Sequence, residues 1–187
     1  RFDNRVKIVN YAKNGATLQS LSLRLDELVE LNPDYVLIQF GHNDQKRYDP
    51  SVYSDRLRSY VERIRKSGGK AVVVSSVTRR SFNADGKIVS NLVKNEKYNY
   101  KATLTDYANA AQAVAKELNL PFIDLHSVSI DHHNKIGREE SMTYNFTEGD
   151  MTHFNKKGAE AVTDLIIKEL KTAVPELADF LKADEPV

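Results

Sequence analysis

The 187-residue sequence contains no cysteine, which excludes disulfides and thiolate-bound metal sites. It has no run of about 18 apolar residues, the length that a membrane-spanning helix requires. No low-complexity tract, internal repeat or proline- and glycine-rich linker divides the chain. The formal net charge is only +1, which argues against a nucleic-acid or anionic-membrane partner. Together with an apolar fraction of 41%, these absences favour one globular domain over residues 1–187.

Short apolar runs alternate with amphipathic segments along the chain. The apolar runs predict strands at residues 5–10, 34–40, 70–76 and 121–125. Apolar side chains at helical spacing predict helices at residues 18–31, 51–66, 101–118 and 156–170, followed by a short helical turn that Pro175 opens. The polar remainder predicts a long loop over 78–100, with a turn at Asp85-Gly86, and an irregular stretch over 126–155. This alternation predicts a parallel sheet with helices on both faces, where sites gather at the carboxyl ends of the strands.

The residues best suited to chemistry fall in the loops that follow the predicted strands. Gly15 lies after the first strand, and Asn43 lies after the second in the sequence FGHNDQ. Asp150 and His153 lie in the loop ahead of the last long helix. An aspartate three residues before a histidine can accept the imidazole Nδ1–H, which leaves Nε2 free as a base. A glycine N–H and an asparagine amide near that imidazole would supply donors to an oxyanion.

The spacing G…GHND…DxxH resembles the SGNH, or GDSL-type, hydrolases. The sequences QFGHND, TRRSFNADGKIV and DMTHFNKKGAEAV further resemble the rhamnogalacturonan acetylesterase branch, and the resemblance covers almost the whole chain. It implies a three-layer flavodoxin-like α/β fold, His153 as general base, Asp150 as its orienting acid, and Gly15 and Asn43 as oxyanion donors. It implies no metal and no organic cofactor. It also implies an acetylated polysaccharide or oligosaccharide as partner, no nucleic-acid or membrane partner, and an extracellular or periplasmic location.

The Gly-Asp-Ser block that carries the nucleophile in this family is absent from the sequence. In a sheet of order 2-1-3-4-5, that block would end an internal strand between the strands at 5–10 and 34–40. Without this strand, two strand edges would face an empty slot with unpaired backbone groups. We therefore expect a domain that lacks its first, internal strand and is N-terminally incomplete. The nucleophilic serine would lie outside these residues, and the 187 residues alone would be inactive.

For the complete protein, the resemblance implies a serine esterase that removes acetyl groups from the pectic polysaccharide rhamnogalacturonan. The general motifs leave open another SGNH esterase, such as a lipase, a thioesterase or a different carbohydrate esterase. The missing nucleophile also leaves open a non-catalytic carbohydrate-binding remnant.

Other polar and aromatic residues have a structural as well as a functional interpretation. His42 and Asp44 are expected to fill and brace their loop, and Gly41 to permit its geometry. Asp131, His132 and His133 are adjacent, but neighbouring histidine side chains diverge, so a solvated polar stretch is expected rather than a metal site. Aromatic residues in the loops could either stack on sugar rings or anchor the loops themselves; they are Phe82, Tyr98, Tyr100, Tyr144 and Phe146.

Overall fold

The computed structural model describes residues 1–182 of the chain. Within them, a parallel sheet of order β1-β2-β5 is formed by Tyr35–Gln39, Lys70–Val74 and Phe122–Ile123. Its register pairs Tyr35 with Lys70 and Gln39 with Val74, and β5 continues the sheet beside the end of β2. Three of the predicted strands are thus confirmed.

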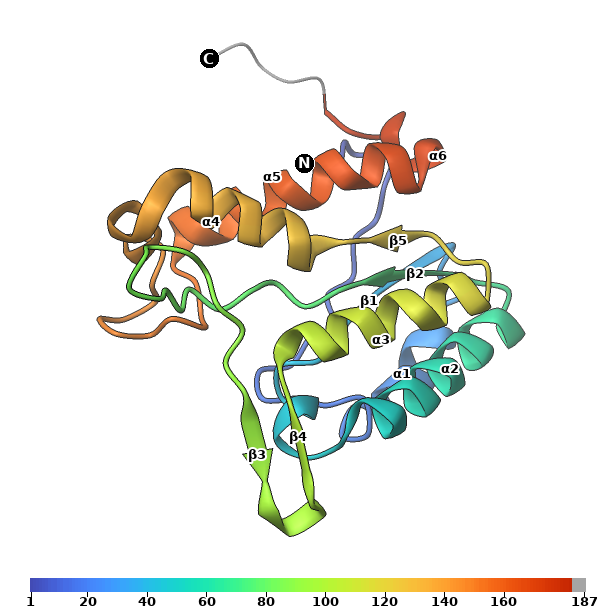
Figure 1. Ribbon diagram of the computed structural model, residues 1–187. Helices are drawn as coiled ribbons and strands as arrows, with labels where there is room; N and C mark the ends of the chain where they lie inside the picture. Colours follow the sequence, from blue (N-terminus) through green and yellow to red (C-terminus); the bar gives the residue numbers. More distant parts are fainter. Residues whose placement is uncertain (183–187) are drawn as a thin grey trace.

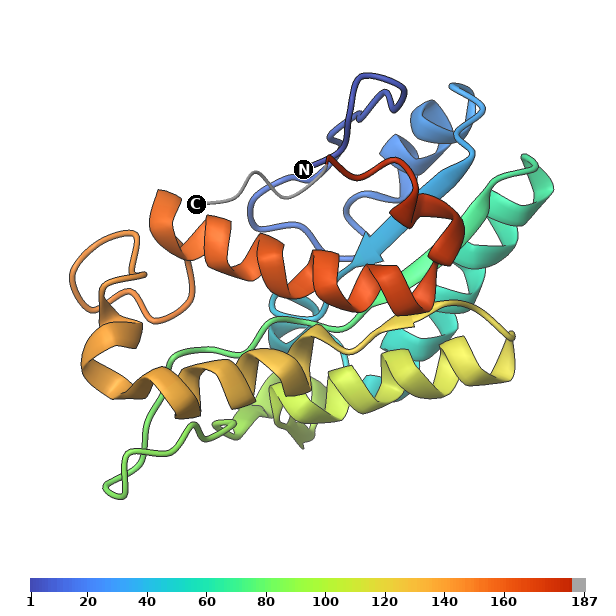
Figure 2. The same cartoon turned by 90° about the horizontal axis from the view of Figure 1, so that it is seen from above.

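Helices cover both faces of the sheet, as the alternating pattern predicts (Figures 1 and 2). On one face lie α1 (Ser22–Val29), α2 (Pro50–Lys66) and α3 (Leu104–Glu117). On the other lie α5 (Lys156–Ala173) and α6 (Pro175–Ala178). Helix α4 (Leu125–Met142) continues from the carboxyl end of β5. The predicted three-layer α/β architecture is confirmed, and α1 begins at Ser22 rather than at residue 18.

Strand β2 contributes to two separate cores, because successive residues of a strand point to opposite faces of the sheet. Ala71 and Val73 pack in the cluster of α1, α2 and α3. Val72 and Val74 pack with residues of α5 and α6. Strand β1 lies at the edge of the sheet and buries only one face, since the side chain of Leu37 is 47% exposed.

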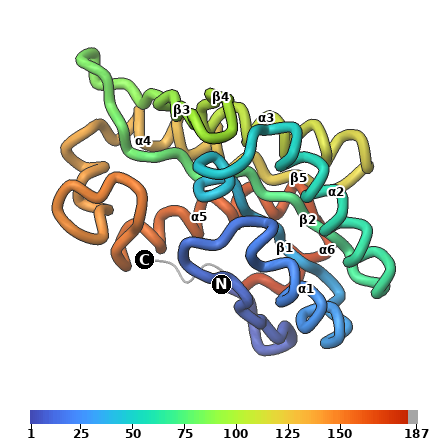
Figure 3. The backbone as a smooth tube through the Cα atoms, turned by 90° about the horizontal axis from the view of Figure 1, so that it is seen from below, coloured from blue at the N-terminus to red at the C-terminus, as the bar shows by residue number. Residues whose placement is uncertain are grey.

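The predicted strand at residues 5–10 is wrong. This segment is irregular, and its apolar side chains Ile8 and Val9 are 67% and 46% exposed. A strand forms only by hydrogen bonding to a neighbour, and β2 is the only strand beside β1 in the part of the chain described. The preceding residues instead pair elsewhere: Asp3 N–H donates to the carbonyl of Phe180. The N-terminal segment then runs along the β1 side of the molecule (Figure 3).

The predicted irregular stretch over 126–155 is also wrong in its first half, where α4 forms. Asp124 caps this helix by accepting the N–H of Ser127, and the helix is interrupted at Gly137, whose φ is +81°. Its buried face carries Ser129 and His133 as well as Leu125. Because polar side chains occupy that face, the apolar periodicity that indicates a helix is missing from the sequence.

A small hairpin forms at the end of the predicted long loop and extends into the first residues of the segment predicted as a helix over 101–118, so that α3 begins only at Leu104. The strands of this hairpin are β3 (Val93–Asn95) and β4 (Tyr100–Ala102), joined by a 3-10 helix, η2 (Glu96–Tyr98). A second 3-10 helix, η1 (Asp44–Lys46), follows β1. The turn at Asp85-Gly86 is confirmed, with Gly86 at a φ of +72°. Among residues 1–182, no helix is both long and apolar enough to cross a bilayer.

Candidate active site

The loop between α4 and α5 carries Asp150 and His153, and residues 145–154 are called the dyad loop below. An antiparallel bridge between Asn145 and Phe154 closes the loop at its base. Within it, the N–H of Phe146 donates to the carbonyl of His153 at 3.2 Å. Asn155 follows as the N-cap of α5, with its side chain accepting the N–H of Gly158. The loop is therefore a closed hairpin fixed to the start of a long helix.

Asp150 and His153 form the predicted acid–imidazole pair. The carboxylate Oδ2 lies 2.9 Å from His153 Nδ1, while Oδ1 accepts the N–H groups of Thr152 and His153, each at 2.9 Å. These backbone donors, with the imidazole, lower the pKa of Asp150 to about 2. An ionised carboxylate can only accept, so Nδ1 carries a proton, and in the neutral imidazole Nε2 is the nitrogen with the free lone pair. The His153 side chain is 57% exposed, and Nε2 has no hydrogen-bond partner within the described residues.

Two consecutive arginines after β2 connect this loop with the loop that follows β1. Arg80 donates to the carbonyls of Asp150 and His153, at 2.9 and 2.6 Å. Arg79 extends to the other side and donates to Gln45 Oε1 at 2.8 Å. Both loops therefore lie at the carboxyl end of the sheet, where Figure 1 shows the dyad loop in orange. Sequence reasoning missed both arginines, because nothing in the pattern marks an arginine after a strand as buried, and arginine side chains are seldom fully buried.

The GHND loop (residues 41–44) is organised by Asp44. Its fully buried carboxylate accepts the N–H of Leu18 at 3.0 Å and of Gly41 at 3.2 Å. Burial raises the pKa of Asp44 despite these donors. Gly41 has a φ of +137°, and a Cβ there would lie 2.2 Å from Ser76 Oγ. The bracing role of Asp44 and the geometric role of Gly41 are confirmed.

Asn43 and Gly15, the predicted oxyanion donors, lie on hydrogen-bonded neighbouring loops. Asn43 Nδ2 donates to the carbonyl of Ala16 at 3.2 Å, directly beside Gly15 in the chain. Gly15 is exposed, with a φ of +76°, and its N–H has no acceptor in the region that the structure describes. One Nδ2 hydrogen and the Gly15 N–H are thus free to meet a ligand. Their role as donors to an oxyanion stays a prediction.

The remaining histidines are neutral and structural. Burial, followed by the charge of Arg79, lowers the pKa of His42 to about 3, and its Nε2 is enclosed. His133 is fully buried on α4, where Nδ1 lies 2.9 Å from Ser141 Oγ. The expectation of a solvated stretch at 129–135 is therefore wrong for His133, because this position faces the core side of a helix. No cluster of three or more metal-ligating side chains gathers among residues 1–182.

Burial distinguishes two of the loop aromatic residues for which the sequence allowed either sugar stacking or loop anchoring. Tyr144 is buried and anchors its loop, whereas Phe146, on the dyad loop, is 66% exposed. A hollow of about 340 Å³ beside Phe146 is lined by Met142 and residues 145–149. Phe146 is thus available to a ligand that reaches His153.

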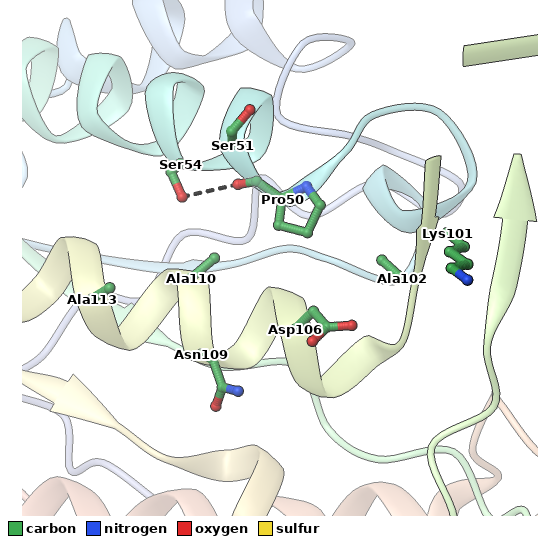
Figure 4. A pocket seen from close by; sticks show the side chains of 9 residues that line it. All are labelled: Pro50, Ser51, Ser54, Lys101, Ala102, Asp106, Asn109, Ala110 and Ala113. Carbon is green, nitrogen blue, oxygen red and sulfur yellow. Dashed lines mark hydrogen bonds between the residues drawn. The ribbon is translucent and has the colours of Figure 1, made fainter. Parts of the chain in front are cut away.

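A larger groove, of about 550 Å³, lies between the N-terminal turns of α2 and α3 (Figure 4). Ser54 Oγ, on its wall, donates to the carbonyl of Pro50 at 2.9 Å. None of the predicted catalytic or oxyanion residues lines this groove. The residues that the sequence suggests for chemistry therefore lie at the carboxyl end of the sheet and not in this groove.

Residues 1–161 match the GDSL-like lipase/acylhydrolase family, and the chain belongs to that family. It is 34% identical to the rhamnogalacturonan acetylesterase RhgT of Bacillus subtilis (strain 168), over 98% of this chain and 82% of the relative. It is 27% identical to YesY, a probable rhamnogalacturonan acetylesterase of the same organism, over 89% of this chain and 77% of that relative. The family resemblance inferred from the motifs is confirmed.

Solved structures share the fold at low sequence identity. The Bacillus subtilis protein YxiM superposes with a TM-score of 0.74 at 20% identity, over 91% of this chain. The present chain spans 47% of that solved chain. A variant of Axe2, an acetylxylan esterase from Geobacillus stearothermophilus, superposes with a TM-score of 0.65 at 19% identity, over 88% of this chain and 72% of that one. These likenesses support the three-layer α/β architecture.

Proposed function

We propose that the protein is a serine esterase that removes acetyl groups from a pectic polysaccharide of the rhamnogalacturonan type. The observation that carries the proposal is the 2.9 Å contact between Asp150 Oδ2 and His153 Nδ1, which leaves Nε2 of an exposed side chain available to a substrate. The nucleophile is a serine outside residues 1–187. The open edge of β1, with Leu37 47% exposed, supports the pairing of a further strand there that carries this serine.

In the proposed reaction, His153 Nε2 takes the proton of the serine hydroxyl while Oγ attacks the acetyl carbonyl carbon. The bond between that carbon and the sugar oxygen then breaks, and His153 returns the proton to the leaving alkoxide. Water, deprotonated by Nε2, next attacks the acetyl-enzyme, releases acetate and restores the serine. Asp150 stays ionised throughout because its pKa is about 2, so it stabilises the imidazolium that forms twice in this cycle.

The negative oxygen of each tetrahedral intermediate would be held by Gly15 N–H, Asn43 Nδ2 and the N–H of the serine. The adjacency of Asn43 to the Gly15 turn, through Ala16, supports this assignment. Losing one such donor typically lowers kcat by about 10²–10³-fold.

The polysaccharide substrate is supported by the 34% identity to RhgT over nearly the whole chain. The exposed Phe146 beside the dyad offers an apolar face against which a sugar ring can pack. We further propose that the protein acts in the extracellular space or the periplasm, where such a polymer is encountered. Immunodetection in the medium or periplasmic extract supports this location, and retention in the cytoplasm contradicts it.

The substrate is tested by measuring acetate release by the full-length protein from acetylated rhamnogalacturonan, with chromogenic long-chain esters as comparison. We expect kcat/KM to be higher for the acetylated polymer. A preference for the long-chain esters would indicate a lipase instead. Binding of the polymer without any acetate release would indicate a carbohydrate-binding remnant.

The nucleophile is tested separately by labelling the full-length protein with a fluorophosphonate and mapping the adduct by mass spectrometry. We expect one labelled serine, outside residues 1–187, and loss of labelling in His153→Ala. An adduct on a serine within this sequence would contradict the proposed triad.

A further inference from the structure

Arg80 is the largest fully buried side chain in the described part of the chain. It lies in the segment that follows β2, and its guanidinium has no carboxylate partner within 4 Å among residues 1–182. Removing a cation from water is costly unless hydrogen bonds and opposing charge or dipoles replace the lost hydration. The surroundings of Arg80 must therefore supply that replacement.

All the identified partners of Arg80 belong to the dyad loop. Nη2 donates to the carbonyls of Asp150 and His153, and Nε donates to Asn145 Oδ1 at 2.7 Å. The backbone N–H of Arg80 donates to the carbonyl of Met151 at 2.9 Å. The guanidinium carbon also lies 4.2 Å from the centre of the Phe154 ring. One side chain thus spans the loop from its base to its catalytic end.

The hydrogen bonds of Arg80 fix the backbone of the two dyad residues. Because a single nitrogen, Nη2, bonds both carbonyls, it fixes the peptide groups of Asp150 and His153 relative to each other. The N–H of His153 then points at the Asp150 carboxylate, while its carbonyl points at Arg80. By contrast, residues 148 and 149, which Arg80 does not bond, are exposed.

We propose that Arg80 is a positioning residue for the catalytic pair: it holds the dyad loop so that His153 keeps one tautomer and one orientation. This inference rests on the proposed function for its catalytic meaning. The positioning itself is a property of the loop and can be measured without turnover. Arg80 does not touch the reacting atoms, so it acts only through Asp150 and His153.

Arg79 provides a matched control for Arg80. It is the neighbouring residue and the same side chain, but its guanidinium donates to Gln45 Oε1 and, at 3.4 Å, to the carbonyl of His42. It therefore braces the loop after β1 and makes no hydrogen bond to the dyad loop. A change at Arg79 should leave the His153 imidazole as it is.

The decisive measurement is the ¹⁵N NMR spectrum of the His153 imidazole in the full-length protein, compared among wild type, Arg80→Lys and Arg79→Lys. We expect one Nδ1–H tautomer in wild type and Arg79→Lys. We expect a mixture of tautomers in Arg80→Lys, because one lysine ammonium cannot replace both Nη2, which bonds the two carbonyls, and Nε, which bonds Asn145 Oδ1. A single unchanged tautomer in a folded Arg80→Lys overturns the proposal.

Steady-state kinetics on a small acetyl ester supply a second readout. We expect Arg80→Lys to lower kcat by about 10²-fold, the loss that a displacement of about 1 Å can cause, while KM changes little. Thermal unfolding shows whether each variant is folded, and Arg80→Gln serves if Arg80→Lys is not. A lower melting temperature with wild-type kcat would reduce Arg80 to a stabilising residue and overturn the proposal. Acetate release by wild type tests the proposed function independently of both results.

Discussion

The GHND loop and the dyad loop are each assembled around one fully buried charged side chain, and the two charges have opposite signs. Asp44 can only accept, so it collects the N–H groups of Leu18 and Gly41. Arg80 can only donate, so it collects the carbonyls of Asp150 and His153. In each loop a buried charge fixes peptide groups by hydrogen bonds. The anion Asp44 bonds N–H groups, whereas the cation Arg80 bonds carbonyl groups.

This difference decides which groups each loop can offer to a ligand. In the dyad loop Arg80 bonds carbonyls, while the N–H groups of Thr152 and His153 bond the Asp150 carboxylate. Since Asp44 occupies the N–H of Gly41, that amide is no longer available to an oxyanion. On that side, Asn43 Nδ2 and the Gly15 N–H are the donors that we propose for an oxyanion. The dyad loop is thus suited to carry a general base, and the GHND loop and the Gly15 turn are suited to carry hydrogen-bond donors to an oxyanion.

The largest expected effect tests this division of labour between the two loops. His153→Ala should lower kcat for acetate release by about 10⁴-fold or more, because no base remains. Asn43→Ala should lower it by only about 10²–10³-fold, because other donors remain. Both are measured on the full-length protein with an acetylated substrate. Equal losses in the two variants would contradict the assignment of base and donor to separate loops.

Removal of the buried anion should destabilise the fold strongly. Asp44→Ala leaves the N–H groups of Leu18 and Gly41 without acceptors, at about 1–3 kcal/mol each in free energy of unfolding. Urea unfolding measures the change. Asp49→Ala is the control, since Asp49 is only the N-cap of α2 and its loss should cost about 1 kcal/mol. If Asp44→Ala lowers the free energy of unfolding no more than Asp49→Ala does, Asp44 does not organise the GHND loop.

Acid pH should destabilise the folded protein by protonating His133, which is buried near Arg80. Burial, with the charges of His132 and Arg80, lowers the pKa of His133 to about 4. The folded state therefore binds fewer protons than the unfolded state, whose histidine titrates near 6.5. Stability is complete above about pH 6.5, and up to roughly 3 kcal/mol is lost as the pH falls to about 4.

Urea unfolding between pH 7 and pH 4.5 measures this dependence. His133→Gln should show a shallower decline than wild type, because glutamine does not titrate. His42 and His126, whose pKa values burial also lowers, contribute to the decline in both proteins, so the difference between the proteins is the informative quantity. Identical declines would show that His133 is not the group responsible.

The smallest expected effect concerns the exposed aromatic on the dyad loop. Phe146→Ala should raise KM for the acetylated polysaccharide up to about tenfold, the loss of roughly 0.5–1.5 kcal/mol of ring contact. KM for a small acetyl ester should not change. Tyr98→Ala, an exposed aromatic on the β3–β4 hairpin, is the control and should leave both values unaltered. An equal rise in KM for both substrates would remove Phe146 from the polymer site.

Most of the fold follows from patterns that the sequence displays directly. The strands β1, β2 and β5 are short apolar runs, and α2 and α3 carry apolar side chains at helical spacing. The two failures have opposite causes. Residues 5–10 have the composition of a strand but no neighbour to pair with, whereas α4 is a helix whose buried face carries Ser129 and His133 instead of apolar residues.

The candidate site divides in the same manner. The sequence identified Gly15, Asn43, Asp150 and His153, because their types and spacing match a known chemistry, and their roles stay predictions. It could not identify Arg80, since an arginine after a strand is ordinarily exposed. Only the packed structure shows that its guanidinium is buried and that Nη2 bonds two carbonyls of a loop about 70 residues further along the chain.

The sequence by itself determined the family, the α/β alternation and the hydrogen bond between Asp150 and His153, because an i, i+3 contact in one loop needs no distant partner. The tertiary structure decided which charges are buried, and hence which loops are rigid. Burial is set by residues far apart in the chain, as with Asp44 and Leu18 or Arg80 and His153. The local sequence around each residue does not show which distant residue it will contact, so such pairs become visible only in the folded structure.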